Sequence, residues 1–172
     1  FYFFFLFTFL LLSLLFTISK ITSHFSSSAL ISIGKITRVS ISNGVTSIVE
    51  RTFAYCVSLE NITISNSITS IEQEAFYNCS GITAMELPEN VTKIGSSAFY
   101  NCTGLTTVVL PDSVTEIGRY TFRNCSSLTS VTIGNNVTSI GEYAFYNCDN
   151  LTSVIIPASV TEIGVFAFFA CD

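Results

Sequence analysis

The chain has 172 residues, of which 49% are hydrophobic and only 11% are charged, and this balance excludes an intrinsically disordered protein. Seven basic residues against twelve acidic ones give a formal net charge of -5, too few cations for the basic surface that nucleic-acid binding needs. With His24 as its single histidine, the sequence offers little for acid–base or zinc chemistry, so we expect no cofactor and no metal site.

Residues 1–19 form a hydrophobic leader that contains no charged residue. The leader is close in length to a membrane-spanning helix, which needs about 20 apolar residues, and it also fits the core of a signal peptide with small residues such as Thr17 and Ser19 near its end. A third interpretation is translated upstream sequence, because the leader is rich in Phe and lacks an initiator Met. These alternatives stay open. The first two predict membrane attachment or secretion.

Residues 20–35 form a Ser-rich seam between the leader and the rest of the chain. Within the seam, residues 31–34 are similar to part of the repeat described below, so we expect a degenerate half repeat there. Every Asp and Glu of the chain lies after the seam, in residues 36–172. The acidic character of the protein therefore belongs to this last region.

Residues 36–172 contain six consecutive copies of a 23-residue repeat. Cys, Phe and Asn each recur at one fixed position of the repeat, which chance does not produce over so many copies. The cysteine column consists of Cys56, Cys79, Cys102, Cys125, Cys148 and Cys171. The phenylalanine column consists of Phe53, Phe76, Phe99, Phe122, Phe145 and Phe168. The asparagine column is shorter and consists of Asn78, Asn101, Asn124 and Asn147.

Each copy predicts the same elements in the same order. Alternating apolar residues, such as Val131 and Ile133, indicate a short strand, and turn formers such as Pro88 end it. A Val-Thr-x-Ile segment predicts a second short strand, and an Ala-Phe-x-Asn-Cys segment predicts one helical turn. One copy buries too little apolar surface to fold alone, so the copies must stack with residues 23 positions apart above one another. The predicted fold class is a β-rich solenoid.

The pattern LxxVxIP followed by VTxIGxxAFxNC resembles the leucine-rich repeats of the BspA-like surface-protein family, and the resemblance covers residues 36–172. It implies a right-handed leucine-rich-repeat coil with short helical turns. It also implies a non-catalytic protein-binding module at the cell surface, used for adhesion to host or matrix protein. Val49 and Glu72 depart from the pattern, since Gly is expected at both positions. These departures affect the local turn and leave the inward-facing columns intact.

The cysteine column predicts free, buried and unreactive thiols rather than disulfides or a metal site. In-register stacking separates the Cβ atoms of neighbouring copies by about 4.8 Å, beyond the ~3.5 to 4.5 Å of a disulfide. The asparagine column predicts a structural ladder whose side chains bond the backbone of neighbouring copies and are too buried to carry a glycan. The better glycan acceptors are the sequon residues Asn61, Asn90, Asn136 and Asn150.

The outward-pointing residues of the first strand in each copy form a repetitive surface rich in hydroxyl groups, which we call the strand face. Val109 and Ile155 add exposed apolar groups to it and are candidate contact points. The candidate ligand-binding residues of the strand face are Arg38, Asn61, Thr63, Glu86, Thr107, Val109, Ser130, Thr132, Ser153 and Ile155. The family resemblance implies a protein as the ligand of this face.

No arrangement of residues predicts an enzyme. Glu116 and Glu162 share a repeat position but lie two copies apart, and a Ser/His/Asp triad has only His24, in the seam, to draw on. The predicted function is binding by a cell-surface or secreted module, and the alternative is an intracellular protein-interaction scaffold. Because the last copy ends without a polar cap, we also expect further repeats or edge-to-edge self-association.

Overall fold

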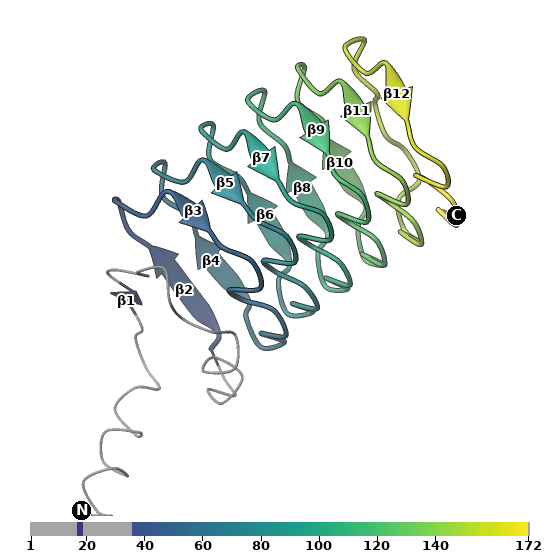
Figure 1. The fold of residues 1–172 in the computed structure, drawn as a ribbon. Helices are drawn as coiled ribbons and strands as arrows, with labels where there is room; N and C mark the ends of the chain where they lie inside the picture. The colour runs from purple at the N-terminus through teal and green to yellow at the C-terminus, as the bar shows by residue number, and fades with distance from the viewer. Residues whose placement is uncertain (1–16, 19–35, 172) are drawn as a thin grey trace, which may run out of the picture.

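The computed structural model of the protein describes residues 17–18 and 36–171. Each copy of the repeat forms one coil, and the coils stack into a solenoid with two rows of parallel strands (Figure 1). The first row holds β1 (Thr17–Ile18), β2 (Arg38–Ile41), β4 (Asn61–Thr63), β6 (Ala84–Glu86), β8 (Thr107–Val109) and β10 (Ser130–Thr132). The second row holds β3 (Ser47–Ile48), β5 (Ser70–Ile71), β7 (Lys93–Ile94), β9 (Glu116–Ile117), β11 (Ser139–Ile140) and β12 (Glu162–Ile163).

Strand pairing between copies joins residues that are 23 positions apart. In the first row, Val108 of β8 lies between Met85 of β6 and Val131 of β10. In the second row, Ile71 of β5 pairs with Ile94 of β7. The β-solenoid that the repeat predicts is therefore confirmed, whereas the right-handed sense of the coil stays a prediction.

Neither row of strands is one continuous sheet. The first row consists of the sheets β1–β2–β4 and β6–β8–β10, and the second row consists of β3–β5–β7 and β9–β11–β12. In the sixth copy, residues 151–157 contain no strand. Strand pairing therefore does not join the neighbouring coils at every step of either row.

The expected helical turn is wrong, because the described part of the chain contains no helix. The second copy shows the reason. Glu74 and Asn78 adopt φ angles of 54° and 59°, in the left-handed region, so the backbone cannot continue as an α-helix. Between these two residues the N–H groups alternate in direction. The N–H of Ala75 donates three residues back within its own coil, whereas that of Phe76 donates to Ala98 O of the next coil at 2.8 Å.

We call the turn that replaces the expected helix the turn segment; in the second copy it consists of residues 73–78. Backbone hydrogen bonds between the turn segments of neighbouring coils form a ladder, which we call the turn ladder. Its central bonds run from Phe53 to Ala75, Phe76 to Ala98, Phe99 to Thr121, Phe122 to Ala144 and Phe145 to Ala167, with N···O distances of 2.7 to 2.9 Å. The turn ladder crosses the positions at which each row of strands is interrupted. Each described coil is therefore bonded to its neighbour through the turn segments, whether or not strands pair at that step.

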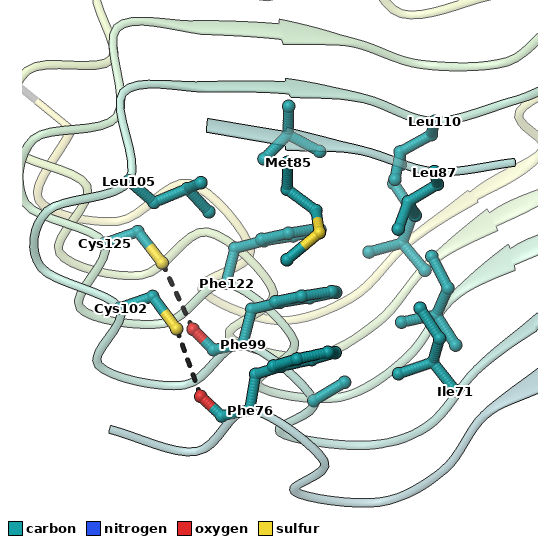
Figure 2. Close-up of a cluster of buried hydrophobic side chains, with 14 of the residues drawn as sticks. Ile71, Phe76, Met85, Leu87, Phe99, Cys102, Leu105, Leu110, Phe122 and Cys125 are labelled. Atoms are coloured by element: carbon teal, nitrogen blue, oxygen red, sulfur yellow. Dashed lines mark hydrogen bonds between the residues drawn. The ribbon is translucent and has the colours of Figure 1, made fainter. Parts of the chain in front are cut away.

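The phenylalanine column fills the centre of the solenoid (Figure 2). Phe76, Phe99 and Phe122 are fully buried, and their ring centroids are 5.2 and 5.3 Å apart with nearly parallel planes. Aliphatic side chains such as Leu110 lie on one side of the rings, and the cysteines lie on the other (Figure 2). Phe168 is half-buried, because the last described copy has a neighbour on one side only.

The hydrophobic leader and the seam lie outside the described residues, apart from Thr17–Ile18. No helix of the described residues is long and apolar enough to cross a membrane. The boundaries at residues 19 and 35, and the three interpretations of the leader, therefore stay predictions.

Candidate ligand-binding face

The strand face follows the first row of strands. Glu86 of β6, Val109 of β8 and Thr132 of β10 are aligned in one column, and Thr107 and Ser130 lie side by side in the next. Every candidate residue of this face is exposed: Arg38, Asn61, Thr63, Glu86, Thr107, Val109, Ser130, Thr132, Ser153 and Ile155. The outward direction of these side chains follows from the two-residue period of a strand.

The structure does not bring all of the candidate residues onto one sheet. Arg38, Asn61 and Thr63 lie on the β1–β2–β4 sheet, which is not paired with the β6–β8–β10 sheet. Ser153 and Ile155 lie in the part of the sixth coil that has no strand. The most regular part of the strand face is therefore the β6–β8–β10 sheet.

The hydroxyl groups near the strand face fall into two sets. Thr106 and Thr129 use their Oγ1 hydroxyls within the protein, donating to backbone carbonyls of the preceding copy at 2.8 and 3.1 Å. In contrast, no hydrogen bond among the described residues engages the hydroxyls of Thr107, Ser130 and Thr132. The second set is open to a ligand.

Val109 and Ile155 are the apolar members of the strand face. The side chain of Val109 is 49% exposed and lies between Glu86 and Thr132, and that of Ile155 is 86% exposed. A single exposed apolar residue needs no functional explanation. The Val109 side chain, with a carboxylate on one neighbouring strand and an unbonded hydroxyl group on the other, has the mixed character of a protein–protein contact surface.

The acidic residues considered for catalysis do not form a pair. Glu116 and Glu162 are both exposed, and Ser139 of β11 lies between them in the second row. Acid–base catalysis by two carboxylates needs both groups to reach the same substrate bond. The arrangement in the second row does not provide that geometry.

The cysteine column lies beside the phenylalanine rings, and its members from Cys56 to Cys148 are free thiols. The fully buried members are Cys79, Cys102, Cys125 and Cys148. The prediction of burial is wrong for Cys56 and Cys171, which belong to the outermost described copies and are half-buried. From Cys79 onward, each Sγ donates to a phenylalanine carbonyl 26 residues earlier, as Cys102 does to Phe76 O at 3.2 Å (Figure 2).

The buried thiols make stability depend on alkaline pH. Burial raises the pKa of Cys102 to about 12, whereas an unfolded thiol ionises near pH 8.5. Between about pH 9 and 12 the Cys102 thiol is therefore ionised in the unfolded chain and protonated in the folded one, so this residue alone should lower the free energy of unfolding by up to ~1.4 kcal/mol per pH unit. The other buried thiols, whose pKa values are also raised, add to this decline. Urea unfolding from about pH 7 to 10.5 measures this slope. Cys102→Ala should show a shallower decline, and equal slopes for the two proteins would contradict the assignment.

The asparagine column is half-buried rather than enclosed, and the bonds to neighbouring backbone predicted for it are wrong where its partners are seen. Asn101 Nδ2 donates to Asn78 Oδ1, and Asn124 Nδ2 donates to Tyr100 Oη at 3.4 Å. All four members, including Asn147, have φ between 57° and 62°, a conformation that Asn tolerates better than most residues. The sequon residues outside this column are exposed: Asn61, Asn90, Asn136 and Asn150.

The structure contains a second surface, which we call the aromatic face, that the invariant positions of the repeat do not predict. It consists of Tyr100, Tyr120, Arg123, Tyr143 and Tyr146, all half-buried on the turn segments. The guanidinium of Arg123 lies 4.6 Å from the ring centroid of Tyr146 and 5.5 Å from those of Tyr120 and Tyr143. The signal in the sequence is the aromatic character of two repeat positions. One position holds Tyr120 and Tyr143, and the other holds Tyr100 and Tyr146, with Arg123 in place of Tyr in the copy between them.

Comparison with solved structures supports the fold. A leucine-rich repeat protein from Eubacterium ventriosum ATCC 27560 is similar at 29% identity and a TM-score of 0.60, over 79% of this chain and 43% of that protein. The T. pallidum leucine-rich repeat protein is similar at 25% identity and a TM-score of 0.54, over 68% of this chain and 65% of that protein. The chain therefore spans less than two thirds of the length of either structure. No curated protein matches the sequence.

The family model described as a BspA type leucine-rich repeat region matches residues 13–102 and 46–172, with six copies. These ranges include all of the coils in the described structure. The repeat pattern, the stacked coils and this match agree. The chain belongs to the family of proteins with BspA type leucine-rich repeats.

Proposed function

We propose that the chain is a non-catalytic protein-binding module that adheres to a host or matrix protein through its strand face. The observation that carries the proposal is the β6–β8–β10 sheet, on which the exposed side chain of Val109 lies between the unbonded hydroxyl group of Thr132 and the carboxylate of Glu86. Hydroxyl groups donate and accept hydrogen bonds, and contact with a partner removes the apolar side chain from water. Membership of the BspA type leucine-rich repeat family supports this function.

The double variant Val109→Ser with Ile155→Ser tests the proposal. Because both side chains are exposed, we expect the free energy of unfolding to change by less than ~0.5 kcal/mol. Binding is measured on immobilised collagen, laminin and fibronectin. The wild-type chain should bind at least one of them, and the double variant should bind it about tenfold more weakly, a loss of ~1.4 kcal/mol.

Val57→Ser is the matched control, since Val57 is 51% exposed and lies outside the strand face. The control should retain wild-type affinity. Wild-type affinity in the double variant, or an equal loss in the control, would remove the strand face from the proposal. Absence of wild-type binding to every protein of the panel would count against adhesion to matrix protein.

The proposed location is the cell surface or the secreted fraction, with the hydrophobic leader as the targeting or anchoring segment. Treatment of intact cells with protease, followed by mass spectrometry of the released peptides, tests this location. We expect peptides from residues 36–171 before the cells are lysed. If these peptides are released only after lysis, the intracellular interaction scaffold replaces the surface module.

A further inference from the structure

Arg123 is a half-buried cation that makes no ion pair among the described residues. Other arginines near the turn segments have carboxylate partners. Arg51 Nε lies 2.6 Å from Glu74 Oε2, and Arg119 Nε lies 3.0 Å from Glu142 Oε2. The positive charge of Arg123 is therefore not neutralised by a neighbouring copy of the repeat.

One edge of the Arg123 guanidinium is closed and the other is open. Its Nε is buried and has no hydrogen-bond partner. Nη1 and Nη2 are not enclosed in the same way, and no hydrogen bond within the described part of the chain engages them. Nε has lost water without gaining an acceptor, which is unfavourable, so the donors that remain available to an acceptor are Nη1 and Nη2 at the open end.

The tyrosine rings hold this guanidinium in one place. The ring centroids of Tyr100 and Tyr146, one copy before and one copy after Arg123, lie 5.8 and 4.6 Å from Cζ. Tyr120 and Tyr143 approach it to 5.5 Å from the neighbouring column. Cation–π contacts with these rings fix the side chain before a ligand arrives, so little further conformational entropy is lost on binding.

The aromatic face presents hydrogen-bond donors rather than open ring faces. The rings of Tyr120 and Tyr143 stack with centroids 5.3 Å apart. Arg119 Cζ also lies over the Tyr120 ring, 4.5 Å from its centroid, and the Phe166 ring lies 5.3 Å from that of Tyr143. Tyr100 Oη accepts a hydrogen bond from Asn124 Nδ2 at 3.4 Å, which leaves its own proton to donate. A surface of N–H and O–H donors favours an oxyanion over a ligand that stacks on aromatic rings.

We propose that the aromatic face is an anion-binding site in which Nη1 and Nη2 of Arg123 bind a carboxylate of the ligand, such as an acidic side chain of a partner. The planar pair of N–H donors matches the two oxygens of a carboxylate, and the charge strengthens both bonds. The site lies on the turn segments rather than on the strand face. It does not depend on the function proposed for the strand face.

Titration with sodium acetate, at constant pH and ionic strength, tests the site in the full chain. In ¹H–¹⁵N NMR spectra, the Nε–H signal of Arg123 and the backbone signal of Asn124 should shift and saturate at millimolar acetate. Arg123→Tyr restores the residue that Tyr100 and Tyr146 represent at this repeat position, so it removes the charge and keeps the stack. It should fold like the wild type and bind acetate at least tenfold more weakly.

Arg38→Asn is the matched control, because it removes an exposed arginine and introduces the residue found one copy later, Asn61. The control should bind acetate as the wild type does. Shifts that do not saturate, or equal binding by Arg123→Tyr, would show that the guanidinium only stacks in the column and would overturn the proposal. A second titration with methyl sulfate distinguishes the anions. Binding tighter than that of acetate would support an oxyanion site but overturn the preference for carboxylate.

Discussion

Replacing Phe99 by Ala is expected to lower the free energy of unfolding by about 4 kcal/mol. Phe99 is fully buried, and its ring stacks on those of Phe76 and Phe122 at 5.2 and 5.3 Å. The substitution leaves a cavity at the centre of the solenoid, where the bonded turn segments on either side limit collapse. It also removes two ring contacts, each worth about 0.5–1.5 kcal/mol. Urea unfolding followed by circular dichroism measures the change.

Thr107→Ala is the control for this measurement, since Thr107 lies on the exposed strand face of the next copy. The control should change the free energy of unfolding by less than ~0.5 kcal/mol. A loss below about 1.5 kcal/mol for Phe99→Ala would place its ring outside a packed core, because full burial of Phe predicts a larger value.

Gly141→Ala is expected to destabilise the protein by about 3 kcal/mol, through overpacking between two coils. A Cβ added at Gly141 would lie 2.7 Å from the backbone N of Arg119 and 2.7 Å from the carbonyl carbon of Gly118. Both atoms belong to the backbone of the preceding copy, so no side-chain rotation relieves the contact. The N–H of Gly141 also donates to Ile117 O at 2.7 Å, and separating the coils would lengthen this bond.

The same substitution one copy earlier provides a matched control. At Gly118 the nearest atoms to an added Cβ are Thr121 Oγ1 at 3.3 Å and Ile94 O at 3.4 Å. A shift of a few tenths of an ångström accommodates the methyl group, and Ala also reduces the conformational entropy of the unfolded chain. We therefore expect a change within ~1 kcal/mol. If urea unfolding showed that Gly118→Ala and Gly141→Ala lower the free energy of unfolding equally, the closer approach of the neighbouring coil at Gly141 would be contradicted.

The repeat alone predicts the parts of the fold that depend on side-chain periodicity. Val131 faces inward and Thr132 faces outward on β10, as the alternation of apolar and polar residues indicates. The constant spacing of Phe76, Phe99 and Phe122 predicts that these residues share one column, and their stacked rings follow from that register.

The turn segment and the aromatic face depend on features that a repeat pattern does not encode. Ala, Phe and Tyr suit a helix, but the left-handed φ angles of Glu74 and Asn78 direct alternate N–H groups to the next coil. Bonding between coils therefore overrides local helix propensity. The surroundings of Arg123 arise from two repeat positions that become neighbours only when the turn is folded, so an alignment of the copies does not show their contact.

Scalar couplings across hydrogen bonds test the central claim most directly, because they identify the donor and acceptor of each backbone bond. In the full chain labelled with ¹⁵N and ¹³C, we expect cross-peaks from the amide nitrogen of Phe76 to the carbonyl carbon of Ala98, and from that of Phe99 to that of Thr121. Such cross-peaks require copies stacked one repeat apart. Couplings from these amides to carbonyls four residues earlier would instead show helices, and would contradict the solenoid.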